Sequence, residues 1–225
     1  MKIIGHRGAK GLAPENTLVS FHKAIEHQVD EVEFDVRVTR DNIAVVHHNP
    51  YLSDPAGNKV VIAAQSLAEL RAHKPNLATL DETLTELKNK CVLLIEIKPA
   101  EPVEPIAAVL AAQIKSGWSS DNLAIGSFDQ TILLEMHRLF PTIAIVVIER
   151  WSGVRAQLRA RQLGTHRLNM RSWWLWSGFL RGMSRRGYQI AAYTLDDPVK
   201  ARRWKKYGLY AVITDYPDRY EGKSW

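Results

Sequence analysis

Apolar and charged residues alternate from Val32 to Arg37, where the sequence reads VEFDVR. A period of two is typical of a β-strand with one apolar and one charged face. Glu33 and Asp35 therefore point the same way along one strand. Such alternation also occurs harmlessly on surface strands, so the remainder of the chain must show whether these carboxylates belong to a site.

A hairpin is predicted directly after this strand. Asp41 and Asn42 form a turn dipeptide that tolerates positive φ, and the β-branched run at residues 43–46 follows it. If the turn is centred between these two residues, equidistant pairing places Asp35 opposite His48, within reach across the two strands. A carboxylate pair beside an imidazole is then expected.

Strand and helix patterns alternate over the whole chain. Strands are predicted at residues 2–5, 31–38, 91–97, 123–126, 143–148, 166–170, 189–193 and 210–213. Helices are predicted after Pro14-Glu15-Asn16-Thr17, over 79–88, over 102–116, from Asp129, over 154–163, over 177–186 and from Asp197-Pro198. Eight such units predict an α/β fold, a TIM (β/α)8 barrel, and no GxGxxG or Walker sequence supports an open sheet.

The chain is expected to form a single domain over residues 1–225, because no Gly/Ser/Pro-rich linker divides it. Residues 49–65 have little helical period and indicate a small excursion after the hairpin. The single cysteine, Cys91, favours a buried side chain in a reducing compartment. Met1 enters a strand pattern at once, which argues against a signal peptide and favours a cytoplasmic location. No stable membrane insertion is expected, since the longest apolar stretch, 106–114, is too short.

Charge is distributed unevenly along the sequence. Residues 1–112 carry a net charge of −3 and residues 113–225 a net charge of +9, which together give the overall +6. Most of the basic excess falls in helical patterns and fits solvated helix faces, although it could also steer an anionic substrate. Without zinc-finger spacing or aromatic RNA-binding motifs, no nucleic-acid partner is expected.

Charged side chains gather at the predicted ends of the barrel strands, which is where the active site of this architecture lies. They are joined by one aromatic residue and, through the hairpin, by a second histidine. The set comprises His6, Arg7, Glu33, Asp35, His48, Glu96, Lys98 and Phe128.

The chemistry of this set favours a phosphate ester as substrate. Three carboxylates, Glu33, Asp35 and Glu96, offer hard oxygen ligands that suit Mg²⁺ or Ca²⁺. Two histidines provide a general base and a general acid. The cationic side chains of Arg7 and Lys98 suit phosphoryl oxygens.

The sequence resembles the glycerophosphodiester phosphodiesterase family over nearly its whole length. The matching motifs are His6-Arg7-Gly8, Pro14-Glu15-Asn16-Thr17, Phe21 with Ala24, Glu33-x-Asp35-Val36, Thr39 with Asp41, Val45-Val46-x-His48, Thr79-Leu80-x-Glu82, Glu96-Ile97-Lys98, Ser127-Phe128 and Thr214-Asp215-Tyr216-Pro217.

The resemblance implies a TIM barrel with a small insertion at about 49–65. It implies a divalent metal on the three carboxylates, His6 and His48 as the acid/base pair, and Arg7 and Lys98 on the phosphate. Glycerophosphodiesters, such as glycerophosphocholine and glycerophosphoethanolamine, would be hydrolysed to sn-glycerol 3-phosphate and an alcohol. The nucleophile, water or a neighbouring substrate hydroxyl, and the oligomeric state stay open.

Three positions depart from the family pattern. Asn49 stands where the family usually has Asp after the second histidine, and Gln28 stands where a glycine is common. Tyr193 replaces a frequent Trp and is expected, with Phe128 and Trp173, in the pocket wall. Trp173 belongs to a cluster with Trp174 and Trp176, for most of which helix packing is the favoured interpretation, over substrate or membrane contact.

Two alternatives to the glycerophosphodiesterase remain. The same site could act as a lysophospholipase D on lysophospholipids. A catalytically silent barrel that binds phosphodiesters is the alternative from a different class of protein.

Overall fold

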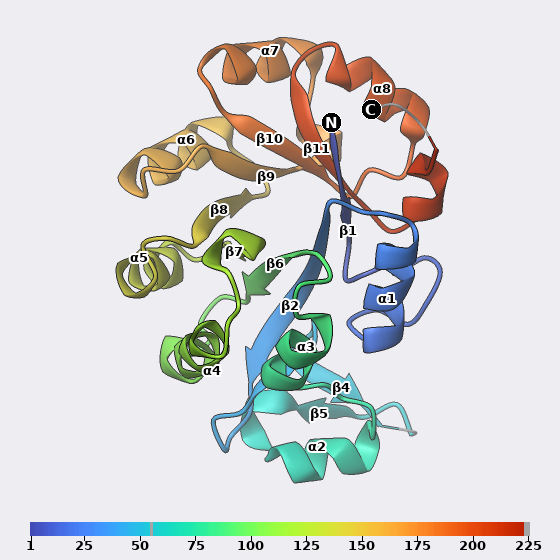
Figure 1. Ribbon diagram of the computed structural model, residues 1–225, viewed down its shortest axis with the longest axis vertical. Helices are drawn as coiled ribbons and strands as arrows, with labels where there is room; N and C mark the ends of the chain where they lie inside the picture. Colours follow the sequence, from blue (N-terminus) through green and yellow to red (C-terminus); the bar gives the residue numbers. More distant parts are fainter. Residues whose placement is uncertain (55, 223–225) are drawn as a thin grey trace.

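Eight parallel strands form a closed ring in the computed structural model, which describes residues 1–54 and 56–222 (Figure 1). The ring closes because β1 pairs with both β2 and β11. In ring order the strands are β1 (Lys2–Gly5), β2 (Glu31–Val38), β6 (Val92–Ile97), β7 (Leu123–Ser127), β8 (Ala144–Glu149), β9 (Arg167–Arg171), β10 (Gln189–Tyr193) and β11 (Leu209–Thr214). The expected TIM barrel is confirmed.

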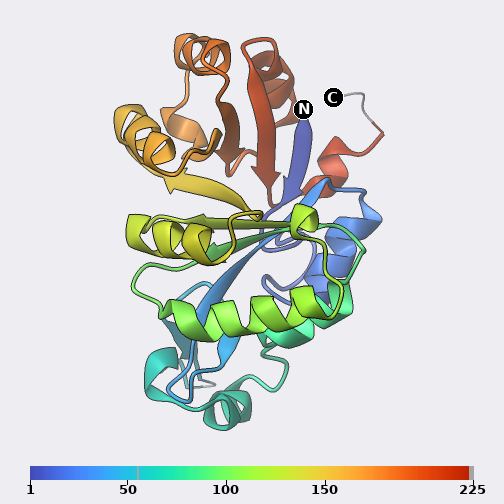
Figure 2. The same cartoon turned by 60° about the vertical axis from the view of Figure 1, so that its left-hand side comes forward.

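Helices follow the strands and cover the outside of the ring (Figures 1 and 2). They are α1 (Leu18–Glu26), α3 (Leu80–Leu87), α4 (Val103–Lys115), α5 (Gln130–Leu139), α6 (Gly153–Gln162), α7 (Ser177–Arg185) and α8 (Pro198–Lys205). Sequence signals set their starts: Thr79 and Glu82 form a complete capping box, and Asp197 caps α8 with Pro198 in its first turn. The predicted helices are confirmed to within a residue or two at their ends.

The hairpin after β2 forms, but its expected register is wrong by one residue. Val36 pairs with Val46 of β3 (Ala44–Val46), so His47, not His48, lies opposite Asp35 and donates its N–H to the Asp35 carbonyl at 3.0 Å. The reason is a loop with an odd number of residues, 39–43, whose centre is Asp41. A hydrogen bond from the Thr39 N–H to the Ile43 carbonyl closes it at 3.0 Å.

A small subdomain-like excursion lies between β3 and α3. It contains the antiparallel pair β4 (Tyr51–Ser53) and β5 (Lys59–Val61), a 3₁₀ turn (Ile62–Ala64) and α2 (Leu67–His73). These elements share a separate apolar cluster of Val45, Leu52, Ile62, Leu70 and Leu77, at the lower end of Figures 1 and 2. The excursion therefore continues past the expected end at residue 65. Pro55, inside the expected insertion, and residues 223–225 of the expected domain lie outside the described residues.

The main core lies between the ring and its helices, where alternate strand residues pack against apolar helix faces. The barrel interior is polar at the amino-terminal ends of the strands, where the fully buried Glu31 binds Lys2 at 3.0 Å and Arg167 at 2.6 Å. Cys91 is only half-buried and packs against the core, and burial raises the pKa of its thiol to about 12. Within the described residues, no helix is long and apolar enough to cross a bilayer.

Candidate active site

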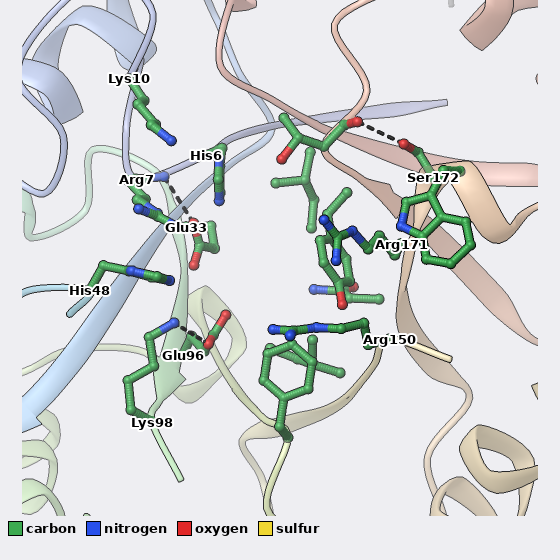
Figure 3. Close-up of a pocket in the computed structure, with 17 residues that line it drawn as sticks. His6, Arg7, Lys10, Glu33, His48, Glu96, Lys98, Arg150, Arg171 and Ser172 are labelled. Carbon is green, nitrogen blue, oxygen red and sulfur yellow. Dashed lines mark hydrogen bonds and ion pairs between the residues drawn. The ribbon is translucent and has the colours of Figure 1, made fainter. Parts of the chain in front are cut away.

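A cavity of about 530 Å³ opens at the carboxyl ends of the barrel strands (Figure 3). The residues expected at the site line it from seven separate segments. The lining includes His6, Arg7, Glu33, His48, Glu96, Lys98, Phe128, Trp173 and Tyr193. Asp35, the remaining expected member, is buried beside Glu33 and Glu96. The barrel therefore brings the whole predicted set together.

The three carboxylates converge because of the β2–β6 register. Asp35 is the direct partner of Glu96 in the parallel pairing, and Glu33 lies two residues earlier on the same face. One oxygen from each carboxylate lies within 4.8 Å of the others, and all three residues are buried. Burial, reinforced by the charge of Asp35, raises the pKa of Glu33 to about 7, and burial also raises the pKa of Glu96.

Cations and an amide hold these acids in place. Lys98 Nζ contacts both Asp35 and Glu96, and Arg7 Nε lies 3.2 Å from Asp35 Oδ2. Asn16 Nδ2 donates to the same Asp35 oxygen at 2.9 Å. Burial alone would raise the pKa of Asp35, but the charges of Lys98 and Arg7 hold it well below its usual range.

The donor set fits a hard divalent cation. It consists only of carboxylate oxygens, at a spacing that lets one ion touch all three, which suits Mg²⁺ or Ca²⁺ and not a thiolate-preferring metal. The raised pKa of Glu33 reflects like charges crowded in a dry site, and a divalent cation would relieve this repulsion.

The loop after β1 positions Arg7 and His6. Arg7 adopts a φ of 50° and Gly8 a φ of 83°, and the backbone N–H of Arg7 donates to Glu33 Oε2 at 2.9 Å. Arg7 Nη1 donates to Glu15 at 2.8 Å, which fixes the guanidinium beside the carboxylates. The glycine is required because a Cβ at position 8 would lie 2.5 Å from Ser20 Oγ.

An acid directly after the last strand favours the protonated form of His6. Its Nδ1 lies 2.5 Å from Asp215 Oδ1, and both side chains are at most one-fifth exposed. Burial opposes the imidazolium, but the Asp215 hydrogen bond and the charge of Glu33 outweigh it and raise the pKa of His6. The Asp215 contact therefore favours the imidazolium form, in which Nε2 of His6 carries a proton that it can donate.

His48 has the opposite character. Burial lowers its pKa, only partly offset by the charge of Asp35. Its Nδ1 donates to Asn49 Oδ1 at 2.9 Å, which leaves Nε2 as the acceptor of a neutral imidazole. Arg37 Nε donates to the His48 carbonyl at 2.9 Å and fixes the backbone. Asn49 thus still orients the second histidine, although it does not supply the charge of an aspartate.

Aromatic side chains form much of the opposite wall. The rings of Phe128 and Tyr193 meet edge to face with centroids 6.3 Å apart, and Trp173 meets Trp151 at 5.3 Å. Trp173 is 56% exposed. The expectation that most of the tryptophan cluster packs against the helix that follows is confirmed for Trp174 and Trp176, whereas Trp173 lines the cavity.

Trp174 meets Phe179 of α7 edge to face at 5.1 Å. The Trp176 ring lies over Gly178 of α7, where a Cβ would come within 1.9 Å of it, although Trp176 is still 61% exposed. Trp173 lies in a 3₁₀ turn (Ser172–Trp174) ahead of α7, so its ring lines the cavity and does not pack against the helix.

Sequence reasoning gave no role to several residues that shape the site: Asn16, Glu15, Asp215, Arg150 and Arg171. Ring closure places the segment after β11 beside the segment after β1, which is the signal that would have paired Asp215 with His6. Asn16 stands in the predicted helix start and reaches Asp35 only through tertiary folding.

Comparisons with known proteins agree with this geometry. The family model described as "Glycerophosphoryl diester phosphodiesterase family" matches residues 6–219. The Bacillus subtilis protein YhdW, whose name assigns it provisionally to the glycerophosphodiester phosphodiesterases, is 28% identical over 97% of this chain and 96% of its own length.

Two solved structures show the same likeness. A phosphodiesterase from Oleispira antarctica, determined in complex with the product sn-glycerol 3-phosphate, is 29% identical with a TM-score of 0.86, covering 97% of this chain and 94% of that one. A glycerophosphodiester phosphodiesterase from Thermotoga maritima is 27% identical with a TM-score of 0.80, covering 98% and 96%. With the barrel, the acidic cluster and this match over nearly all its length, the chain belongs to the glycerophosphoryl diester phosphodiesterase family and is a phosphoric diester hydrolase.

Proposed function

We propose that this protein hydrolyses glycerophosphodiesters to sn-glycerol 3-phosphate and an alcohol, with a divalent cation, Mg²⁺ or Ca²⁺, on Glu33, Asp35 and Glu96. The observation that carries the proposal is the convergence of these three buried carboxylates with two histidines whose pKa values are shifted in opposite directions in one cavity. When bound, the cation supplies charge for the phosphoryl oxygens and a polarised oxygen ligand.

The histidines divide the proton transfers between them. His48 is neutral with a free Nε2, so it accepts the proton of the attacking hydroxyl, which belongs either to water or to the substrate's glycerol moiety. His6, whose protonated form is favoured by Asp215, gives its Nε2 proton to the leaving alcohol oxygen as the phosphorus–oxygen bond breaks. Groups whose surroundings push their pKa values apart are suited to these two roles.

Arg7 and Lys98 are proposed to contact the substrate phosphate. Both line the cavity, but in this structure each is engaged with carboxylates: Arg7 with Glu15 and Asp35, and Lys98 with Asp35 and Glu96. A cation on the acids would compete for the oxygens that now hold Lys98, so that its ammonium could turn toward the phosphate. Phosphate contact by both side chains stays a prediction.

The test is product analysis with purified protein. Glycerophosphocholine and glycerophosphoethanolamine are incubated with protein reloaded with Mg²⁺ or Ca²⁺, alongside His48→Ala and His6→Ala. We expect sn-glycerol 3-phosphate and the free alcohol from the wild type, and losses of about 10²-fold or more in both variants. Release of a phosphoalcohol and free glycerol instead would contradict the proposal.

Lysophospholipase D action is the second candidate, because the exposed rings of Trp173 and Trp151 adjoin the cavity and could carry an acyl chain. The same assay with a lysophospholipid, comparing Trp173→Ala with wild type, separates the two activities. Retention of both histidines and all three acids favours either enzyme over a silent binding protein. We also propose a cytoplasmic location, consistent with a single cysteine that has no partner for an internal disulfide.

A further inference from the structure

Two arginines line the wall of the cavity that lies opposite the acidic cluster. Arg150 follows β8 and Arg171 ends β9, and both line the cavity. Figure 3 shows their guanidinium groups directed into it from the side opposite Glu33 and Glu96. Neither residue has a role in the metal or proton chemistry described above.

Neither guanidinium is neutralised by an acid. Among residues 1–54 and 56–222, no Asp or Glu oxygen forms an ion pair with Arg150 or Arg171. Glu149, the acid next to Arg150 in the chain, forms an ion pair with Arg155 at 2.6 Å and accepts hydrogen bonds from backbone N–H groups. The two arginines therefore bring uncompensated positive charge to the cavity.

Aromatic rings fix both guanidinium groups. Arg150 Cζ lies 5.4 Å from the centre of the Phe128 ring, and Arg171 Cζ lies 5.7 Å from the centre of the Trp173 ring. Tyr193 is close to both arginines: burial raises the pKa of its hydroxyl, while the charge of Arg150, a hydrogen bond from Arg150 and the charge of Arg171 oppose that rise. A guanidinium held beside a ring, with one N–H given to a hydroxyl, still presents its other N–H groups to an anion.

On the wall that carries the three carboxylates, the charges are balanced without these arginines. Three carboxylates there face Lys98 and Arg7, and a divalent cation would offset the remaining negative charge and that of the scissile phosphodiester. A phosphodiester carries one negative charge, so two further guanidinium groups exceed what its recognition needs. They would also repel a choline or ethanolamine cation at short range.

We propose that Arg150 and Arg171 bind a second anionic group, a phosphate monoester or a carboxylate, on the alcohol moiety of the substrate. This inference rests on the proposed function and specifies its substrate class: glycerophosphodiesters whose alcohol is negatively charged. Planar guanidinium donors form paired charge-assisted hydrogen bonds with either anion. The preference would thus be opposite to that for zwitterionic glycerophosphocholine.

The test compares four substrates of similar size that differ in the charge of the alcohol. Glycerophosphoglycerol is neutral at this moiety, glycerophosphocholine is cationic, and the derivatives with glycerate or glycerol phosphate as the alcohol carry a carboxylate or a phosphate. The quantity measured is the ratio of kcat/KM for each charged substrate to kcat/KM for glycerophosphoglycerol. We expect a ratio of about 10 or more for the two anionic substrates and below 1 for the choline substrate. The larger ratio of the two anions identifies whether phosphate or carboxylate is preferred.

Variants assign the preference to the arginines. In Arg150→Gln/Arg171→Gln the anionic ratios fall to about 1, whereas Arg150→Lys/Arg171→Lys retains part of them because the charge is kept. Arg161→Gln, an exposed charge removal on α6, serves as the matched control and leaves the ratios as in wild type. Melting temperatures verify that each variant is folded, and the wild-type comparison needs no variant at all.

Three results would overturn the inference. A wild type that hydrolyses glycerophosphoglycerol with anionic ratios near 1 has no second-anion site, and the proposed function still stands. Equal losses on all four substrates in the Gln variant would assign the arginines to the scissile phosphate. No sn-glycerol 3-phosphate from any of the four, or from glycerophosphoethanolamine, would remove the proposed function and this inference with it.

Discussion

Replacing Asp215 by Asn tests how the protonation state of His6 is set. In the wild type, His6 Nδ1 and Asp215 Oδ1 lie 2.5 Å apart, with side chains 14% and 20% exposed. An Asn side chain fills the same space and still accepts a hydrogen bond, but it carries no charge. The substitution therefore removes the ionic part of the contact and leaves the shape of the site.

The magnitude follows from typical hydrogen-bond energies. Hydrogen bonds to charged groups contribute roughly 1.5–3 kcal/mol and neutral ones about 1 kcal/mol, so the change costs the imidazolium about 1–2 kcal/mol. One pKa unit corresponds to about 1.4 kcal/mol, and the pKa of His6 should fall by about one unit. Activity that needs protonated His6 is lost as pH rises through this pKa, so the alkaline limb of the pH profile should move about one unit lower.

The assay is kcat/KM for a glycerophosphodiester between about pH 5 and 10, in wild type, Asp215→Asn and the control Asp218→Asn. Asp218 is an exposed acid three residues further along, and its removal should leave the profile unchanged. The acidic limb, assigned to neutral His48 with its lowered pKa, should stay where it is, because activity there is lost as pH falls. An unmoved alkaline limb, or a moved acidic one, would refute the assignment of His6 as the acid.

Three further substitutions test the supports of the site. Lys98→Met leaves Asp35 and Glu96 without the ammonium that they share, so the free energy of unfolding, measured by chemical denaturation in EDTA, should fall by about 3 kcal/mol. Saturating Mg²⁺ or Ca²⁺ should restore part of this loss, and equal losses with and without metal would contradict the reasoning. Thr79→Ala breaks the α3 capping box and should lower the free energy of unfolding by about 1 kcal/mol while kcat/KM is retained. An unchanged free energy of unfolding would contradict this prediction. Gly8→Ala places a Cβ 2.5 Å from Ser20 Oγ at a φ of 83°, so both the melting temperature and activity should drop, and a variant as stable as wild type would show that the loop adapts.

Local sequence signals were sufficient for most of the fold. Capping residues such as Thr79 and Asp197 satisfy the first N–H groups of their helices wherever the chain goes, so they predict helix starts reliably. The period of two in β2 likewise predicted that Glu33 and Asp35 share a face. The barrel then accounts for the site, because its strand ends converge on one opening.

Features that depend on tertiary geometry were harder to predict from the sequence. The hairpin register turned on whether the loop has an even or odd number of residues, which the Asp41-Asn42 dipeptide does not decide. The pairing of His6 with Asp215 depends on ring closure between residues more than 200 positions apart. The division of the tryptophan cluster between cavity and helix depends on where α7 begins, since Trp173 precedes the helix while Trp174 and Trp176 pack against its first turn.

The most direct test of the central claim is titration of Mg²⁺ or Ca²⁺ into metal-stripped protein, with heat of binding and release of sn-glycerol 3-phosphate followed in parallel. We expect one ion bound per chain, activity that returns in proportion to occupancy, and loss of both in Glu96→Gln, with Glu104→Gln, which removes an exposed acid at the start of α4, as control. Full activity in the stripped protein, or an ion that still binds and activates after the Glu96 substitution, would contradict it.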